Sequence, residues 1–171
     1  MAVGFSTDTD DSGPGTDGTI HNAAWKQAME DAIDALVGDW TAWTPTIGGS
    51  TSQSGQVYSV QVGRYRKTAK EINFYGTVTL STLGTITGNV QIKGLPTAET
   101  NTTARSASVY LGFFSAMTTS YVWLGGFIAV NTTAITMQGM TAAATGTSNL
   151  AQADLSNTTS WTFAGFYETD T

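Results

Sequence analysis

The chain has 171 residues, of which 12% are charged, and its formal net charge is −6 at pH 7. This length fits one compact core with an extension, and the low charge content predicts a surface kept soluble by Thr, Ser, Asn and Gln. The absence of cysteine excludes disulfides, thiolate metal sites and cysteine nucleophiles, and the acidic balance without a basic stripe argues against a nucleic-acid partner.

Residues 1–45 differ in charge from the rest of the chain. Eight of the thirteen acidic residues lie there, with one of the seven basic residues. Residues 6–19 contain acids, Gly and turn formers but no apolar residue, which predicts an irregular arm that becomes ordered against a partner. Residues 1–11 lack the basic and apolar regions of a secretory signal, and no apolar run is long enough to span a membrane. We therefore expect synthesis in a cytoplasm and no membrane insertion.

Residues 23–37 are predicted to form an amphipathic helix, with Thr19 or Asn22 as the N-cap and Gly38 as the stop. Spacings of four, three and four residues place Trp25, Met29, Ala32 and Leu36 on one seam, and Ile33 and Val37 flank it. A helix of about 15 residues is marginal alone, so the seam is expected to pack on its own domain, on identical copies or on a larger body. The residues expected to mediate oligomerisation or anchoring are Trp25, Met29, Ile33 and Leu36.

After Pro45 the pattern changes to short segments of period two, separated by Gly, Asn and Thr. Strands are expected near residues 57–62, 64–68, 71–80, 85–93, 105–114, 120–130, 134–140 and 160–168. This spacing predicts a mainly β fold, an antiparallel β-sandwich, preceded by the acidic arm and one short α-helix. The expected division is an N-terminal segment at 1–45 and a β-sandwich knob at 46–171.

The tripeptide Asn-Thr-Thr recurs three times between the expected strands, beginning at Asn101, Asn131 and Asn157. Asn tolerates left-handed backbone angles and Thr favours strands, so these tripeptides are typical of turns. We expect them to mark loops at one end of the sandwich. Alternation predicts buried side chains at Phe74, Trp123, Phe127, Trp161 and Phe163, which leaves tyrosines and loop residues as candidates for a binding face.

No catalytic, cofactor or metal site is predicted. His21 is the only histidine, which excludes a Ser-His-Asp triad in the C-terminal region and any site with several histidines. Neither a phosphate-binding Gly-x-x-x-x-Gly-Lys sequence nor a Gly-x-Ser-x-Gly sequence occurs. The acids Glu71, Glu99, Asp154, Glu168 and Asp170 are scattered and form no motif for glycoside hydrolysis. We therefore expect a protein that is not an enzyme.

Short motifs carry a resemblance to a known family. In chain order they are Trp43-Thr44-Pro45, Gly63-Arg64-Tyr65, Gly84-Thr85-Ile86-Thr87-Gly88-Asn89-Val90 and Gly94-Leu95-Pro96. Over residues 45–100 the chain resembles the C-terminal β-sandwich or jelly-roll domain of tail-fibre and head-fibre structural proteins of tailed bacteriophages. The resemblance implies a homotrimeric knob on a virion, fastened to other virion proteins by residues 1–45.

What the resemblance implies for function is a surface appendage, either a head fibre or a short tail fibre. Exposed knob loops, including those around Asn101, Asn131 and Asn157, would then be free to contact host-surface polysaccharide and gain avidity from three copies. Two other readings stay open. One is a capsid decoration protein that stabilises the head without a ligand, and the other is a free carbohydrate-binding module.

Overall fold

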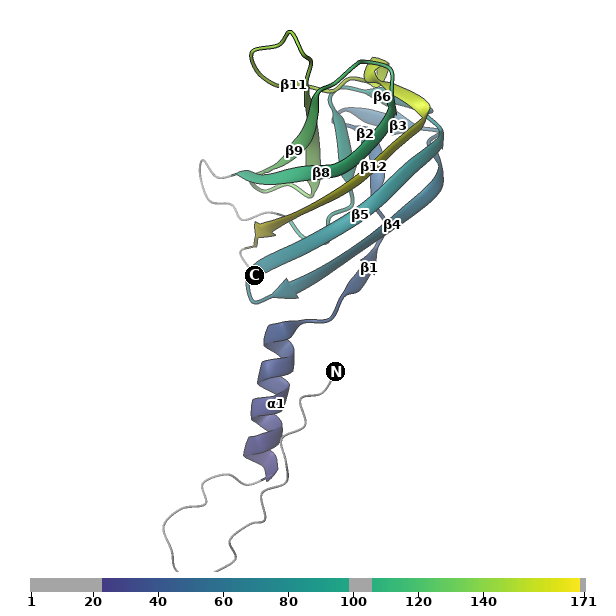
Figure 1. Cartoon of the computed structure of the whole chain (residues 1–171). Helices are drawn as coiled ribbons and strands as arrows, with labels where there is room; N and C mark the ends of the chain where they lie inside the picture. Colours follow the sequence, from purple (N-terminus) through teal and green to yellow (C-terminus); the bar gives the residue numbers. More distant parts are fainter. Residues whose placement is uncertain (1–22, 99–105, 170–171) are drawn as a thin grey trace, which may run out of the picture. The chain divides into compact units, whose positions relative to one another are not determined.

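The computed structural model describes residues 23–98 and 106–169. The chain divides into two compact units, residues 1–38 and residues 39–171. The described part of the first unit contains helix α1 (Ala23–Val37), and all strands belong to the second, which we call the β unit (Figure 1). The expected acidic arm, residues 6–19, lies outside the described residues.

Helix α1 begins and ends as its sequence predicts. Gly38 follows it with a φ of 57°, and its N–H donates to the carbonyl of Asp34 over 3.1 Å, the left-handed C-terminal cap for which glycine is suited. On the seam, Met29 is 43% exposed and Ile33 is half-buried. Both N-cap candidates, Thr19 and Asn22, lie outside the described residues.

Among the described residues, ten strands join one antiparallel sheet and two short strands form a second sheet. The path through the large sheet is β1-β4-β5-β12-β8-β9-β10-β7-β2, with β11 paired to β10, and β3 pairs with β6. The fold is therefore mainly β and antiparallel with one short helix before it, as predicted. The bounds are β1 (Thr41–Trp43), β2 (Thr46–Gly49), β3 (Ser52–Ser54), β4 (Val57–Thr68), β5 (Glu71–Thr82), β6 (Thr85–Thr87), β7 (Val90–Lys93), β8 (Ser106–Met117), β9 (Trp123–Ala129), β10 (Ala134–Met140), β11 (Ser148–Asn149) and β12 (Leu155–Glu168), with a short 3-10 helix at Gln152–Asp154.

The large sheet curls so that its two ends approach each other (Figure 1). Its terminal strands, β1 and β2, are consecutive in the chain, and only Thr44 and Pro45 separate them. The hydroxyl of Tyr58 on β4 donates to the carbonyl of Ile47 on β2 over 3.1 Å and accepts from the N–H of Ile47 over 2.8 Å. The two halves of one sheet therefore enclose a common core, in the manner of a sandwich.

The core is built from the inward residues of paired strands. A row of isoleucines crosses one half, because Ile47 faces Ile92, Ile92 faces Ile135 and Ile135 faces Ile128. All four are fully buried. The other half contributes aromatic side chains, and the largest fully buried ones are Trp161, Tyr167 and Phe163.

Glycines on β4 and β5 make room for these rings. Gly63 pairs with Gly76, and a Cβ on Gly63 would lie 2.3 Å from Nε1 of Trp43, while one on Gly76 would lie 2.8 Å from the ring of Phe163. The rings of Trp43 and Phe163 are 6.2 Å apart at 75°, an edge-to-face contact. Two motifs therefore contact each other in the structure, because the ring of Trp43-Thr44-Pro45 lies on the glycine of Gly63-Arg64-Tyr65.

Some local predictions were wrong. Residues 57–68 form a single strand, because Gly63 accommodates Trp43 without interrupting the ladder. Residues 85–93 form two strands, because Gly88 adopts a φ of 83° between them. Phe74, Trp161 and Phe163 are buried as predicted, whereas Phe127 is half-buried and Trp123 is 43% exposed. Trp123 faces outward because Leu124 takes the inward position at the start of β9.

Candidate functional site

Exposed apolar side chains gather on the outer face of β4, β5, β12 and β8. On β4 the outward residues are Val60, Val62, Arg64 and Arg66, which oppose Thr79, Thr77, Tyr75 and Asn73 of β5. Tyr75 in turn opposes Ala164 of β12, and Ala164 opposes Tyr110 of β8. Tyr110 is 65% exposed and Phe166 is 59% exposed. Large aromatic side chains at this exposure are informative, because most such residues in a soluble domain are buried.

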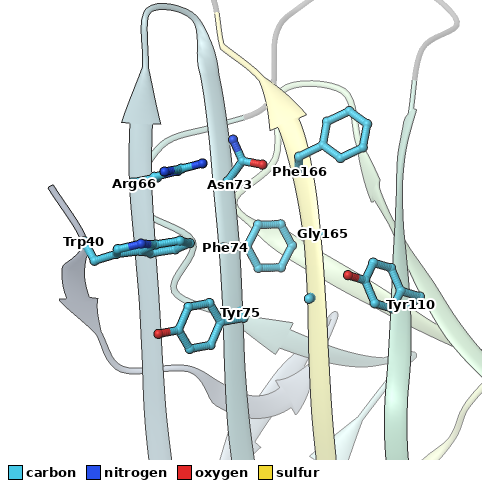
Figure 2. A pocket seen from close by; sticks show the side chains of 9 residues that line it. Trp40, Arg66, Asn73, Phe74, Tyr75, Tyr110, Gly165 and Phe166 are labelled. Carbon is cyan, nitrogen blue, oxygen red and sulfur yellow. The ribbon is translucent and has the colours of Figure 1, made fainter. Parts of the chain in front are cut away.

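A hollow of about 280 Å³ lies within this face (Figure 2). It exists because β12 contributes the small residues Ala164 and Gly165 between larger neighbours on β5 and β8. We call it the aromatic hollow. It is lined by Trp40, Arg66, Asn73, Phe74, Tyr75, Tyr110, Ala164, Gly165 and Phe166.

One side of the aromatic hollow is formed by Trp40 and Arg66. Trp40 directly precedes Thr41, whose partner on β4 is Tyr65, and it therefore stands beside Arg66. The guanidinium carbon of Arg66 lies 5.2 Å from the centroid of the Trp40 ring, within the range of a cation–π contact. The same indole meets Tyr75 edge-to-face, with ring centroids 5.0 Å apart. These contacts hold the guanidinium over the Trp40 ring.

A pair of carboxylates lies next to the hollow. Glu71 and Glu168 are direct cross-strand partners on β5 and β12, two residue pairs beyond Asn73 and Phe166 and on the same face. The amide of Asn73 donates to Oε1 of Glu71 over 2.6 Å. Glu71 thus has a hydrogen-bonding role within the outer face, and like charges placed opposite each other oppose sheet pairing.

Asp154, another acid considered for catalysis, holds together a turn at the far end of the strands. Its carboxylate accepts from the hydroxyl of Thr119 over 2.6 Å and from the N–H of Ala151 over 2.8 Å. Burial first, and then the hydrogen bond and negative charge of Asp154, raise the pKa of Tyr121 to about 12. Tyr121 also lies over Gly139. Asp154 therefore has structural partners on three sides.

The predicted loop residues do not meet. Asn131 lies between β9 and β10 with a φ of 59°, whereas Asn157 lies near the start of β12, where its Oδ1 accepts from the N–H of Leu83 over 2.8 Å. The start of β8 pairs with the end of β9, and the end of β8 pairs with the start of β12, so the length of β8 separates the two asparagines. The expectation that these tripeptides share one end is wrong for this pair, and Asn101 lies outside the described residues.

Some residues of the outer face were not predicted from the sequence. Tyrosines were candidates, and Tyr75 and Tyr110 are exposed, but Trp40, Arg66 and Phe166 were not singled out. Phe166 faces outward because the alternation along β12 places Gly165 and Tyr167 inward on either side of it. An aromatic residue directly after glycine in a strand is the signal that would have identified it.

No metal or membrane feature appears in the part of the chain that the structure describes. Within residues 23–98 and 106–169, no three His, Asp or Glu side chains are grouped so that they could hold a metal ion. Over the same ranges no helix has both the length and the hydropathy of a membrane span.

No protein-family model matches the chain, and no curated protein matches it. Among solved structures, the crystal structure of the Dettilon tailspike protein (gp208) is similar, with a TM-score of 0.59 and 19% sequence identity. The match covers 78% of this chain but 24% of the tailspike chain, so this chain spans about a quarter of that protein. The likeness shows that the fold of the β unit is shared with part of a tailspike protein.

Proposed function

We propose that the chain is a non-enzymatic structural protein of a bacteriophage virion, a trimeric surface appendage whose β unit is exposed and contacts host-surface glycans. The observation that carries the proposal is the fold shared with part of the Dettilon tailspike protein over 78% of this chain. The resemblance of the Trp43-Thr44-Pro45 and Gly63-Arg64-Tyr65 motifs to phage fibre domains points to the same class of particle. The chain assembles in the host cytoplasm and resides on the virion.

A non-enzymatic role is supported by the contacts of the acids in the β unit. Asp154 accepts hydrogen bonds from Thr119 and Ala151, and Glu71 accepts one from Asn73. A general acid or a nucleophile in glycoside hydrolysis needs a carboxyl group free to reach the sugar. Asp154 has a structural role in its turn, and Glu71 is hydrogen-bonded to Asn73.

Attachment is assigned to the N-terminal segment, for which the charge pattern predicts residues 1–45 and of which residues 39–45 belong to the β unit. The helix holds three copies together through its seam and the flanking Ile33, with Trp25, Met29, Ile33 and Leu36 as the contact residues. The acidic arm contacts other virion proteins. The 43% exposure of Met29 supports an apolar seam available to a partner. With the seam in this role, the outer face of the β unit remains open for a ligand. This open face favours an appendage over a capsid decoration protein without a ligand.

The proposal is tested on purified virions from the phage that encodes the chain. Mass spectrometry should detect its peptides after density-gradient purification, in a copy number per particle that is a multiple of three. Gold-labelled antibody against the β unit should bind intact particles, because the β unit is exposed in the proposed arrangement. Finding the chain in infected cells but not on purified particles would contradict the proposal.

Met29→Asp should convert the trimer to a monomer. A carboxylate in an apolar seam must lose its hydration in each of three copies, which is unfavourable by several kcal/mol without a partner. Light scattering should give the 17.9 kDa mass of one chain for the variant and three times that mass for the parent.

The control for the seam is Asp31→Ala, which also changes the charge by one unit but alters the face where Asp31 accepts from Gln27. It should remain a trimer. Retention of the trimer by Met29→Asp would remove the seam from the proposal.

A further inference from the structure

A buried hydrogen-bond donor in the aromatic hollow has no partner in the described residues. Nε of Arg66 is inaccessible to solvent and makes no hydrogen bond there, while Asn73 opposite it is bonded to Glu71. A buried donor without an acceptor is unfavourable by about 1–3 kcal/mol, and more when it belongs to a charged group. Trp43 Nε1 and Thr97 Oγ1 are also buried without a partner among the described residues, but only Arg66 lines the aromatic hollow. Such exceptions are rare in native proteins and each needs an explanation, and for a donor beside a hollow an acceptor bound there is one.

The guanidinium is already held in place for such an acceptor. It rests on the Trp40 ring at 5.2 Å, and Trp40 is itself braced edge-to-face by Tyr75. Figure 2 shows the guanidinium of Arg66 beside the amide of Asn73, at one side of the hollow. A preorganised guanidinium loses little conformational freedom on binding, and its planar fork suits a carboxylate or a phosphate.

The rest of the hollow is suited to a flat ring with one apolar face. Tyr75 and Tyr110 are the cross-strand partners of Ala164 on its two sides. Phe166 projects beside Gly165 (Figure 2). Exposed aromatic rings stack against the C–H faces of sugar rings, and Tyr hydroxyls and the Asn73 amide can bond to sugar hydroxyls. At about 280 Å³ the hollow is close to the lower end of small-ligand sites, which fits a single sugar unit of a longer chain.

We propose that the aromatic hollow binds an acidic sugar unit, with its carboxylate or phosphate paired to Arg66 and its ring over Ala164 and Gly165. The proposal rests on the proposed contact with host-surface glycans and names both the site and the ligand class. It moves the contact from Asn131 and Asn157 to the sheet face.

The charges around the hollow fix the orientation of the ligand. Arg64 lies next along β4 on the same outer face and adds a second positive charge. The carboxylates of Glu71 and Glu168 lie beyond Asn73 and Phe166 and repel an anion. The acidic group therefore lies on the side of β4, and the remaining sugar chain extends toward β8 and Tyr110.

The test is binding of the full-length protein to immobilised glycans that bear hexuronate, sialate or phosphate groups, each beside its neutral counterpart. Binding should be confined to acidic glycans and should weaken as salt rises. For a glycan that binds, Arg66→Gln should lower the affinity by about ten- to a hundredfold, the effect of losing a hydrogen bond to a charged group. Lys70→Gln removes the same charge from the exposed turn between β4 and β5 and should change affinity less than about twofold.

Three results would overturn the site. They are an absence of binding across the acidic set, equal binding of neutral counterparts, and an Arg66→Gln variant that binds like the parent.

A further alternative is that a second copy of the chain covers this face. Tyr110→Asp, at a 65% exposed position, should leave the light-scattering mass unchanged if the site binds sugar, and a fall in mass would assign the face to self-association.

The outcome is separable from that of the proposed function. A chain present on virions but unable to bind acidic glycans would retain the virion role and lose this site. A chain that binds them in the Arg66-dependent way but is absent from virions would retain the site and lose the virion role.

Discussion

Replacing Trp161 by alanine should lower the free energy of unfolding of the β unit by about 3–5 kcal/mol, the range found for buried aromatic residues. Trp161 is fully buried, lies between Val78 of β5 and Phe114 of β8, and donates from Nε1 to Sδ of Met117 over 3.4 Å. Its loss would leave a cavity in the core where β12 lies between β5 and β8. Urea unfolding followed by circular dichroism measures the change.

Trp123→Ala provides the matched control, because the same atoms are removed from a side chain that is 43% exposed. It should lower stability by less than about 1 kcal/mol. Equal losses of stability in the two variants would show that burial does not determine the contribution of Trp161.

Gly63→Ala should destabilise the β unit by about 1–3 kcal/mol, although alanine is a small residue and the site is in a strand. The added Cβ would lie 2.3 Å from Nε1 of Trp43, so the indole or β4 must move. Thermal and urea unfolding measure the loss. Combining Gly63→Ala with Trp43→Leu should cost less than the sum of the single changes, because the two residues share one contact.

Gly112→Ala is the control for this substitution. Gly112 lies on β8, and a Cβ there meets no atom within 4 Å. Stability should be unchanged or slightly raised, because alanine restricts the unfolded chain. A loss at Gly112 equal to that at Gly63 would show that strand propensity, and not the Trp43 contact, determines the effect.

The regular elements of this protein follow from local patterns in the sequence. Met29 and Ile33 lie within a run of helical period, Gly38 ends it, and the structure confirms the helix at Ala23–Val37. Strand β5 has alternating buried and exposed residues from Glu71 onward, so its position and inward face were predictable. Local patterns are sufficient to predict the position and the inward face of an element when one of its sides is buried along its length.

Short strands and exact register were not predictable in the same way. β1, β2 and β3 have three or four residues each, too few for a period, and they exist because β4, β7 and β6 provide partners distant in sequence. Trp123 illustrates register, since either Trp123 or Leu124 could have faced inward. Pairing with Met140 and Gly139 of β10 decides this, and that pairing depends on the whole sheet.

The candidate site was partly predictable. Tyrosines were expected to be available on the surface, and Tyr75 and Tyr110 are, but Tyr167 is buried and bonds through its hydroxyl to the carbonyl of Thr97. The role of Arg66 could not be read from the sequence. It depends on Trp40, 26 positions earlier in the numbering, reaching the same edge of β4.

The placement of β1 has a mechanical consequence. Tension on the N-terminal segment enters the β unit at Thr41, the first residue of β1. Beyond Thr44 and Pro45 the same stretch of chain continues into β2, so the load is shared between β4 on one side and β7 on the other. A force that separates the N-terminal segment from the β unit must break the pairing of β1 with β4. It must also pull the buried Trp43 away from its contact with Gly63. The terminal strand β1 is thus also the point where the β unit resists a pulling force on the N-terminal segment.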